Sequence, residues 1–545
     1  MSDPNFDQIL QDHNSIRRYI DPSNLPSNPG QVEITNLKLI SPLNFNINID
    51  LQFIFTSMEI AENIFSPYVE GYIKIVDTVG HWERIPIVGD EFLHVTFKSK
   101  GSSSIDEIDK VFRIVKMSNF RRDPSNDRVH QYTLEFRSIE YILNIQNKVQ
   151  KCYGKKSIGE MVKDIYSEYI SHPFMSTHFG DYVQEIDVED TSGQYNITIP
   201  NMTPFQAFSF LSSRSMSSNT YDTKSFGAFY SFYETLKYGF QFRSLESIMQ
   251  NEPTFNYFYA PNNLPYDDYY KSIAHGSHNI SEYYRISAIA VDENLKKGMY
   301  ANRLITHNML RMKYDIHDLY YKKKNNNNYE NSVFDPSTQS LITRDSIQYP
   351  DDLGDASYKR DSPNIISYES DFFKMSDNPI ISHDSDLLGK PKSNITLAST
   401  NEGSWAKFAF DDDSPLVKDP NIRDTDIEKW FSNRKMQKIL LNSFIYNVKA
   451  PGNTHRSIGD ILFLDIPTAL GESVNSPATI SSGARSNTLV SGSYITTRVA
   501  HVFTKDQADV SHTLSMHVMK DSLSRKLPLP IMQFGDDDSV MGDEY

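Results

Sequence analysis

The chain has very little cysteine: Cys152 is the only one among 545 residues. A single cysteine excludes an internal disulfide and any metal site built from paired cysteines. Apolar runs are also short, and none approaches the ~18 residues that a membrane-spanning helix needs. The first fourteen residues, MSDPNFDQILQDHN, are polar and acidic rather than apolar. We therefore expect neither a signal peptide nor a membrane-spanning segment, and synthesis in a reducing cytoplasm.

Basic residues are fewer than acidic ones, with 54 Lys and Arg against 70 Asp and Glu and a net charge of −16. A protein that wraps nucleic acid would instead carry a basic stripe. A negative surface repels a polyanion, so this composition is compatible with a surface past which a polyanion slides without binding.

The common catalytic signatures are missing. The sequence has no phosphate-binding GxxxxGK[ST], no GxGxxG, no HExxH and no GxSxG. We therefore predict no catalytic, cofactor-binding or metal-binding residue, and no enzyme activity.

Two clusters come nearest to a site. The first contains metal-ligand residue types whose spacing fits no known coordination geometry, which favours a solvated or hydrogen-bonded segment; its members are His307, Asp315, His317 and Asp318. The second lies in a loop and would form a charge pair at most; its members are His172, His178 and Asp181.

For each of the other charged features, a structural role competes with a functional one. Cys152 lies among Lys151, Lys155 and Lys156, which favour a thiolate, but without a partner motif an ordinary thiol is expected. Glu234 and Arg243 would form a cross-strand ion pair if they faced each other. Two charge runs remain. One is a lysine run expected at a solvated loop tip, Lys322, Lys323 and Lys324. The other is an acidic tail that is either a solvated end or a docking peptide, with Asp536, Asp537, Asp538, Asp543 and Glu544.

Aromatic residues are abundant, with 32 Tyr and 32 Phe, and these favour strands. Residues 31–139 predict a small antiparallel β-barrel domain. Its strands are indicated by alternation or β-rich composition and cover 45–55, 69–77, 91–99, 110–120 and 130–139.

Residues 140–280 predict a mixed α+β module. Ser157 and Glu160 form a capping box at the start of one amphipathic helix, and Thr203, Pro204 and Gln206 begin another. Residues 228–234 and 239–245 then predict an aromatic β-hairpin. We expect 172–200 to be loop-rich and 254–270 to be an ordered aromatic loop.

Strand character resumes over 281–321 and again over 437–525, including 439–450, and these two ranges predict a second β-barrel domain. Residues 322–436 predict an insertion, with one helix over 424–436. An arm over 1–30 and an acidic tail over 526–545 complete the division. The predicted fold class is therefore mainly β, with two antiparallel barrels flanking a mixed helical and hairpin module.

Four patches, in this order, resemble the baseplate hub proteins of contractile-tailed bacteriophages and, more distantly, the N-terminal half of the type VI secretion spike protein. They are FSPYVEGYIKIVDTVGHWERIPIVGDEFLHVTF at 65–97, KSIGEMVKDIYSEYI at 156–170, the helix and hairpin within 201–248, and IGDILFLDIP with SGSYITTRVAHVF at 458–467 and 491–503.

The resemblance implies two tail-tube-like barrels in each chain, and a homotrimer that adapts a sixfold tail tube to a threefold central spike. It further implies that the trimer encloses a channel for genome ejection and resides in the virion after synthesis in the host cytoplasm. The implied partners are the tail tube protein, the central spike protein and baseplate wedge or other tail proteins, with the tape measure protein as a further neighbour; DNA passes without specific binding.

Residues 322–436 depart from the compact hubs, and no lysozyme-like domain or needle repeat is present, so we expect the spike to be a separate polypeptide. Three alternatives stay open. One is the hub of a phage-derived injection device such as a tailocin, which gene neighbours would distinguish. Another is a tail-associated cell-wall hydrolase, which would require a cleft with paired carboxylates or a metal. The third is a carbohydrate-binding module built on 254–270.

Overall fold

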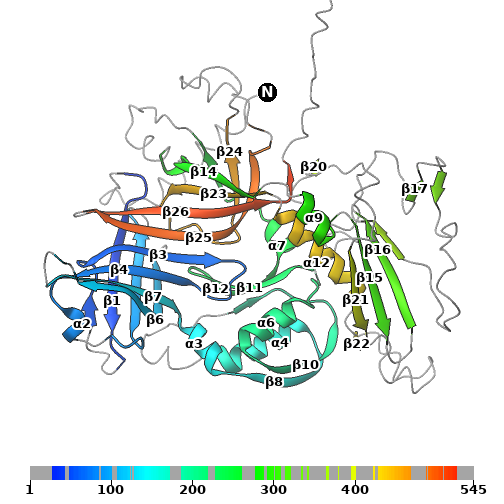
Figure 1. The fold of residues 1–545 in the computed structure, drawn as a ribbon, viewed down its shortest axis with the longest axis horizontal. Coiled ribbons are helices and arrows are strands. Elements are labelled where there is room, and N and C mark those ends of the chain that lie inside the picture. The colour runs from blue at the N-terminus through cyan, green and yellow to red at the C-terminus, as the bar shows by residue number, and fades with distance from the viewer. Residues whose placement is uncertain are drawn as a thin grey trace, which may run out of the picture.

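The computed structural model shows a mainly β protein (Figure 1). It describes residues 28–42, 48–84, 87–100, 107–122, 124, 128–171, 186–218, 228–259, 276–287, 291–299, 301–308, 313–320, 333–335, 340–342, 364–367, 378–379, 394–400, 422–423, 427–442, 444–467, 487, 489–506 and 509–523. Most of the predicted arm, the Lys322–Lys323–Lys324 run, the cluster His172, His178 and Asp181, and the acidic tail lie outside these residues.

The first barrel is formed by antiparallel strands in the order β3-β4-β7-β6-β5-β1-β2. Inward side chains such as Ile73, Val95 and Leu134 are fully buried in its core. The predicted strands at 69–77, 91–99, 110–120 and 130–139 are confirmed. The strands are β1 (Val32–Ile40), β2 (Asn48–Asp50), β3 (Phe55–Asn63), β4 (Glu70–Asp77), β5 (Phe92–Ser99), β6 (Ile108–Arg122) and β7 (His130–Ser138), with a short helix α2 (His81–Arg84) after β4.

The single strand predicted over 45–55 is wrong. Residues 43–47 lie outside the described part, and β2 ends at Asp50. The chain then turns, with backbone hydrogen bonds from Ile54 and Phe55 back to the Leu51 carbonyl, and Phe53 is 79% exposed. The alternation of apolar and polar residues in the sequence continues through this turn, because successive side chains point in different directions in a tight turn as well as in a strand.

The second barrel has the order β14-β23-β26-β25-β24-β13. It closes where Phe258 forms a bridge with Asn279 and the Ile280 N–H donates to the Phe258 carbonyl at 2.8 Å. The range predicted as an aromatic loop, 254–270, therefore contributes a strand, which pairs in parallel with β24. The strands are β13 (Phe255–Phe258), β14 (Glu282–Ser287), β23 (Phe444–Pro451), β24 (Ile461–Asp465), β25 (Gly492–Asp506) and β26 (Asp509–Lys520).

The long β25–β26 hairpin belongs to both barrels, and Figure 1 shows it lying between them. Strand β25 pairs with β3 from Arg498 to Thr504. At the far end of the first barrel, the His512 N–H donates to the Gly30 carbonyl at 2.9 Å, which brings the start of β1 onto β26. Phe503 accordingly packs in the first core, whereas Val499 packs in the second. One hairpin therefore joins the two barrels as a common wall.

A histidine pair lies inside this shared wall. His501 Nδ1 and His512 Nε2 are 3.0 Å apart, and both side chains are fully buried beside Phe97 and Phe503. Burial lowers the pKa of His501 to about 3, and burial together with its neighbour His501 lowers the pKa of His512 well below its ordinary value. Both rings are therefore neutral in the folded protein at neutral pH.

These two histidines should make the fold sensitive to acid. An unfolded chain binds protons at both rings below pH ~6.5, whereas the folded chain does not, so stability falls as the pH drops. At pH 5 each ring costs about 2 kcal/mol of unfolding free energy relative to neutral pH. His501→Leu should remove about one proton from the pH dependence of urea unfolding between pH 7 and pH 5. An unchanged dependence would contradict the assignment.

The α+β module lies beside the barrels and has its own core. Its three-stranded sheet has the order β22-β10-β8, and a second sheet has the order β11-β12-β9. Both predicted capping boxes are confirmed, at Ser157 with Glu160 and at Thr203 with Gln206. The elements are α3 (Ile139–Gln146), β8 (Val149–Lys156), α4 (Ile158–Ile165), the π-helical turn η2 (Tyr166–Ile170), β9 (Ile186–Val188), β10 (Gln194–Met202), α6 (Pro204–Ser212), β11 (Tyr230–Thr235), β12 (Gly239–Ser244), α7 (Leu245–Met249) and β22 (Ile422–Arg423). Strands β9 and β10 lie in the range 172–200 that was predicted as loop-rich.

A separate sheet occupies the right side of Figure 1, with the order β19-β16-β15-β21. The sequence interpretation placed 281–321 in the second barrel, but within that range only β14 pairs with it, through β23. The other elements of this region are α9 (Val291–Lys297), β15 (Ala301–Asn308), β16 (Lys313–Tyr320), β17 (Val333–Asp335), β18 (Ser340–Ile342), β19 (Asn364–Ser367), β20 (Asn378–Pro379), β21 (Ile395–Thr400), α12 (Ile427–Leu441) and β27 (Ser522–Leu523).

Two boundaries in this region differ from the sequence-based expectation. Helix α12, predicted over 424–436, continues to Leu441, so the strand predicted from 439 begins instead at Phe444. Residues Val291–Lys297 form helix α9 where the strand pattern was predicted to continue. At α12 the short apolar run Ile439–Leu441 fits a buried helix as well as a strand, whereas α9 carries mostly charged residues that suit an exposed helix. None of the helices in the described residues has both the length and the apolar character that a bilayer crossing requires.

Candidate functional site: a buried joint at the aromatic hairpin

The hairpin β11–β12 is closed by a short turn. The Thr235 hydroxyl accepts a hydrogen bond from the Tyr238 N–H at 2.8 Å and donates one to the Gly239 carbonyl at 3.1 Å. Gly239 has φ +70°, a left-handed conformation that favours glycine. This local chemistry explains why the sequence folds back between Thr235 and Gly239.

The hairpin contacts three hydrophobic cores. Phe232 and Phe240 stack at 5.4 Å in the core of the α+β module. Tyr233, which points to the other face of β11, packs in the core of the second barrel. Leu236, in the turn, packs in the core of the first barrel. A single hairpin therefore sets the relative positions of the module and both barrels.

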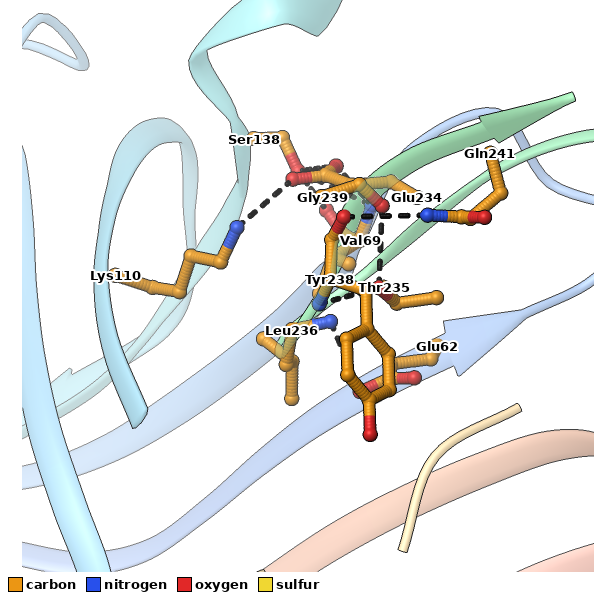
Figure 2. A network of polar contacts seen from close by, with 10 residues as sticks. All are labelled: Glu62, Val69, Lys110, Ser138, Glu234, Thr235, Leu236, Tyr238, Gly239 and Gln241. Carbon is orange, nitrogen blue, oxygen red and sulfur yellow. Dashed lines mark hydrogen bonds and ion pairs between the residues drawn. The ribbon is translucent and has the colours of Figure 1, made fainter. Parts of the chain in front are cut away.

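Polar groups accompany these apolar contacts, and we call the set Glu62, Lys110, Ser138, Glu140 and Glu234 the polar joint. Figure 2 shows all of them except Glu140. The Glu234 carboxylate accepts from the Val69 N–H at 3.0 Å and from the Ser138 hydroxyl, and it lies 3.8 Å from the Lys110 ammonium. It thereby connects the hairpin to β6 and to the ends of β4 and β7.

Glu62 connects the hairpin turn to the second barrel. From β3, its carboxyl accepts from the Leu236 N–H at 3.1 Å. It also accepts from the Ser457 hydroxyl at 2.9 Å and the Ile458 N–H at 3.3 Å, both in the segment between β23 and β24. Burial raises the pKa of Glu62 to about 7, although these hydrogen bonds and Lys110 oppose that increase.

Glu140, in the first turn of α3, completes the joint. Its side chain is buried, and its Oε2 atom has no hydrogen-bond partner. Burial, and then the nearby Glu234 carboxylate, raise the pKa of Glu140 to about 8. Glu140 is therefore mostly protonated at neutral pH.

The joint is built to hold segments together rather than to react. Glu62 and Glu234 are each 1% exposed, Glu140 is 6% exposed, and Lys110 is 6% exposed. A substrate cannot reach carboxyl groups that are closed off from solvent to this degree. The buried ion pair and its hydrogen bonds instead hold the connected segments in one relative geometry.

Glu234 and Arg243 do not face each other, so the condition for an ion pair between them is not met. In the hairpin register Glu234 lies opposite Phe240, and Arg243 lies opposite Ser231. Arg243 pairs instead with Asp187 on β9. The composition of the two strands was predicted, but a register cannot be derived from the presence of two charges.

Of the other sequence candidates, the structure describes the side chains of His307, His317 and Cys152. His317 is buried on β16, where its Nε2 atom lies 3.3 Å from the Thr306 hydroxyl, and His307 is on β15. Cys152 is exposed on β8, and its sulfur accepts from the Thr198 hydroxyl at 3.3 Å. In the part of the chain that the structure describes, no group of three or more His, Cys, Asp or Glu side chains is arranged to hold a metal ion.

Sequence reasoning missed most of the joint, although a signal was present. Lys110 lies two residues before the buried Phe112 and four before Ile114, so the three point to the same face of β6. Glu234 likewise shares one face of β11 with the buried Tyr230 and Phe232. A charged residue on the inward face of a strand implies a buried partner. The identity of that partner depends on which strands meet in space.

Comparisons with known proteins give structural neighbours only. No protein-family model matches the chain, and no curated protein matches it. The tail protein of Neisseria meningitidis MC58 aligns over 90% of this chain and 99% of its own, with a TM-score of 0.40 and 7% identity. The 43 kDa tail protein of prophage MuSo2 from Shewanella oneidensis aligns over the same shares, with a TM-score of 0.37 and 7% identity. An Escherichia coli component of the type VI secretion system aligns over 90% of this chain and 76% of its own, with a TM-score of 0.32 and 8% identity.

These neighbours are phage tail and type VI secretion proteins, the two groups named by the sequence resemblance. With TM-scores below 0.5, the likenesses by themselves assign no function to this chain.

Proposed function

We propose that the chain is the structural hub of a contractile-tail baseplate, acting as a homotrimer that joins the tail tube to the central spike. The observation that carries this proposal is the pair of barrels that share the β25–β26 wall within one chain. A rigid pair of tube-like barrels in each of three chains supplies six barrels. A threefold assembly can then meet a sixfold tube on one face and a threefold spike on the other.

The polar joint and the hairpin give this role its physical basis. A hub must hold its two barrels at a constant spacing, because each barrel of a pair must fit the tube in the same way. Contacts from Glu62 to the hairpin turn and to the second barrel provide such a constraint. The net charge of −16 suits a channel that genomic DNA passes without binding.

The proposed parts of the chain follow from this role. Residues 31–139 form the first tube-like barrel and 140–280, apart from β13 and the residues that bridge to it, form the hub module; 437–525 with β13 and part of 281–321 form the second barrel. Residues 322–436 and 526–545 contact neighbouring baseplate proteins, such as the wedge. The protein acts in the virion, and the tail tube protein and the separate spike protein bind opposite faces of the trimer.

The oligomeric state tests this proposal. We expect purified chain to form a species of three times the 62.6 kDa mass of one chain, measured by light scattering after size-exclusion chromatography. In cryo-electron microscopy of intact particles, the trimer should form a ring about one tube width across between tube and spike. A monomer both in solution and in assembled particles would exclude the hub function.

A further inference from the structure

Strand β21 has one unpaired edge. Among the described strands its only neighbour is β15, with which it pairs in parallel. The Arg303 N–H donates to the Asn394 carbonyl at 2.8 Å, and because backbone groups alternate between the two edges of a strand, the even-numbered residues of β21 face β15. The N–H and C=O groups of Ile395, Leu397 and Ser399 therefore point to the outer edge, where none of the described residues pairs with them.

This edge lacks the usual protection against an added strand. Proteins commonly guard an exposed edge with charged residues or proline. The edge strand β14 carries Glu282 and Arg285, and the edge strand β8 carries three lysines. Strand β21 reads ITLAST, with neither a charge nor a proline. Its backbone is therefore open to pairing with an extended segment.

An apolar row across the sheet also stops at this edge. Ile316 of β16, Ile305 of β15 and Leu397 of β21 are neighbours in register on one face of the sheet. Ile316 is 7% exposed, whereas Leu397 is 72% exposed and Ile395, on the same face of β21, is 56% exposed. A further strand with an apolar residue opposite Leu397 would continue the row and cover it.

The C-terminal tail contains a segment suited to this position. Residues 527–535, LPLPIMQFG, include five large apolar residues and no charge. Pro528 and Pro530 have no N–H, and in an extended segment both would face the same edge. The opposite edge keeps its donors, including those of Leu529 and Ile531. Such a segment can pair along one edge only, which is where proline is tolerated in sheets.

The charges that flank the two segments agree on one register. When the segments run antiparallel with Ile531 opposite Leu397, the residues with free donors, Leu529 and Ile531, meet the outward backbone groups of β21. The same register brings together three pairs of opposite charge, Lys526 with Glu402, Asp536 with Lys392, and Asp538 with Lys390. A parallel arrangement would instead place lysines beside lysines. Charge and hydrogen bonding therefore select the same antiparallel pairing.

The length of the chain indicates that the segment comes from a neighbouring copy. The Asn394 side-chain amide donates to the Lys296 carbonyl, so β21 begins beside α9, and Thr400 lies about 20 Å further along the strand. The tail follows β27, which pairs with β20, and Figure 1 shows both β20 and α9 toward the upper end of this sheet. From Leu523 to Lys526 the chain spans at most about 11 Å, too little to pass Thr400 at the far end.

We propose that the outer edge of β21 binds residues 527–535 from the tail of a neighbouring copy as an antiparallel strand. This inference rests on the proposed trimer and adds a defined contact to it. Each of three chains would give one strand to the next chain and receive one, and under threefold symmetry these contacts close into a ring. The neighbour that the tail contacts is then another hub chain.

Disulfide formation between full-length chains tests the pairing. In a Cys152→Ser background, chains with Leu397→Cys are co-expressed with chains with Ile531→Cys. Oxidation should link them into a covalent dimer, because residues directly opposite in such a pair lie about 5.5 Å apart at their Cα atoms. Chains of either kind alone should not link.

The next residue of the tail supplies the matched control. Met532 would point to the other face of the sheet, so Met532→Cys should give about fivefold less dimer with Leu397→Cys. Equal yields from Ile531→Cys and Met532→Cys would overturn the pairing. A link that forms only within a chain carrying both Leu397→Cys and Ile531→Cys would show that the chain binds its own tail, and would overturn the exchange between copies.

A peptide separates this contact from the hub function. The receptor is the full-length chain with Ile531→Pro, whose own tail lacks a donor for β21. A labelled peptide of residues 524–538 should bind it in fluorescence anisotropy. Ile531→Pro in the peptide should weaken binding about tenfold, whereas Met532→Pro, which removes a donor facing away from β21, should change it by less than about threefold.

The two proposals fail in different ways. Trimers in light scattering together with a peptide that binds no better than its Ile531→Pro form would overturn the tail contact and leave the hub function standing. A chain that is monomeric in solution and in particles but binds the peptide with the expected difference between the two proline forms would exclude the hub function and retain the β21 site.

Discussion

Glu234→Leu is expected to lower the free energy of unfolding by about 3–5 kcal/mol, the usual cost of removing one partner of a buried ion pair. The substitution leaves the Lys110 ammonium buried without its carboxylate. It also removes one of the acceptors of the Val69 N–H and of the Ser138 hydroxyl, which keep their hydrogen bonds to each other. Urea unfolding monitored by tryptophan fluorescence and by circular dichroism measures this loss.

Two further variants identify its cause. Lys110→Met combined with Glu234→Leu replaces both charges by apolar groups, so it should recover more than half of the lost stability. The Lys116–Glu135 pair is the matched control, because its side chains are 62% and 38% exposed. Glu135→Leu should change stability by less than about 1 kcal/mol. If the double variant were no more stable than Glu234→Leu alone, the buried charge of Lys110 would not be the source of the loss.

Phe240→Ala should cost a similar amount, about 3–5 kcal/mol, through the cavity that it leaves in the module core. Phe240 is fully buried between Phe232 and Tyr166, with ring centroids 5.4 Å away on each side. Phe208→Ala should behave alike, because its ring lies 4.2 Å from Phe232. Under the proposed hub function, both variants should also form fewer trimers in light scattering.

The same hairpin supplies the control for this second prediction. Tyr238 is also aromatic but is 60% exposed, so Tyr238→Ala should change stability by no more than about 0.5 kcal/mol. Trimer formation equal to that of the unmodified chain in both Phe240→Ala and Phe208→Ala would show that the hairpin does not control assembly.

Both predictions concern a feature that sequence reasoning located but could not explain. Capping residues predicted the start of α6 at Pro204, and aromatic alternation predicted the two strands of the hairpin. Glu234 was identified as a charged residue of that hairpin, with Arg243 as its partner only if the two faced each other, which they do not. Its true neighbours, Lys110 and Ser138, lie about a hundred residues earlier in the chain, and no local pattern relates positions so far apart.

The sheets show the same division. Four strands of the first barrel were predicted because they are rich in β-branched and aromatic residues, such as Val95 and Phe97 of β5, which the fold buries. Strand β13 was taken for a loop because it has only four residues, too few to show a pattern. Strands β15 and β16 were recognised as strand-like, but their partners β19 and β21 come from a range without clear periodicity.

The sequence by itself determined the mainly β class, the capped helices, the aromatic hairpin and the absence of common catalytic motifs, because these depend on residues that are near neighbours along the chain. Only the tertiary structure decided that β25 and β26 serve both barrels, that the hairpin contacts three cores, and that Glu234 pairs with the buried Lys110 ammonium. Burial and electrostatic interaction depend on distance in space, and the fold brings Glu62, Lys110, Glu140 and Glu234 together from separate parts of the chain.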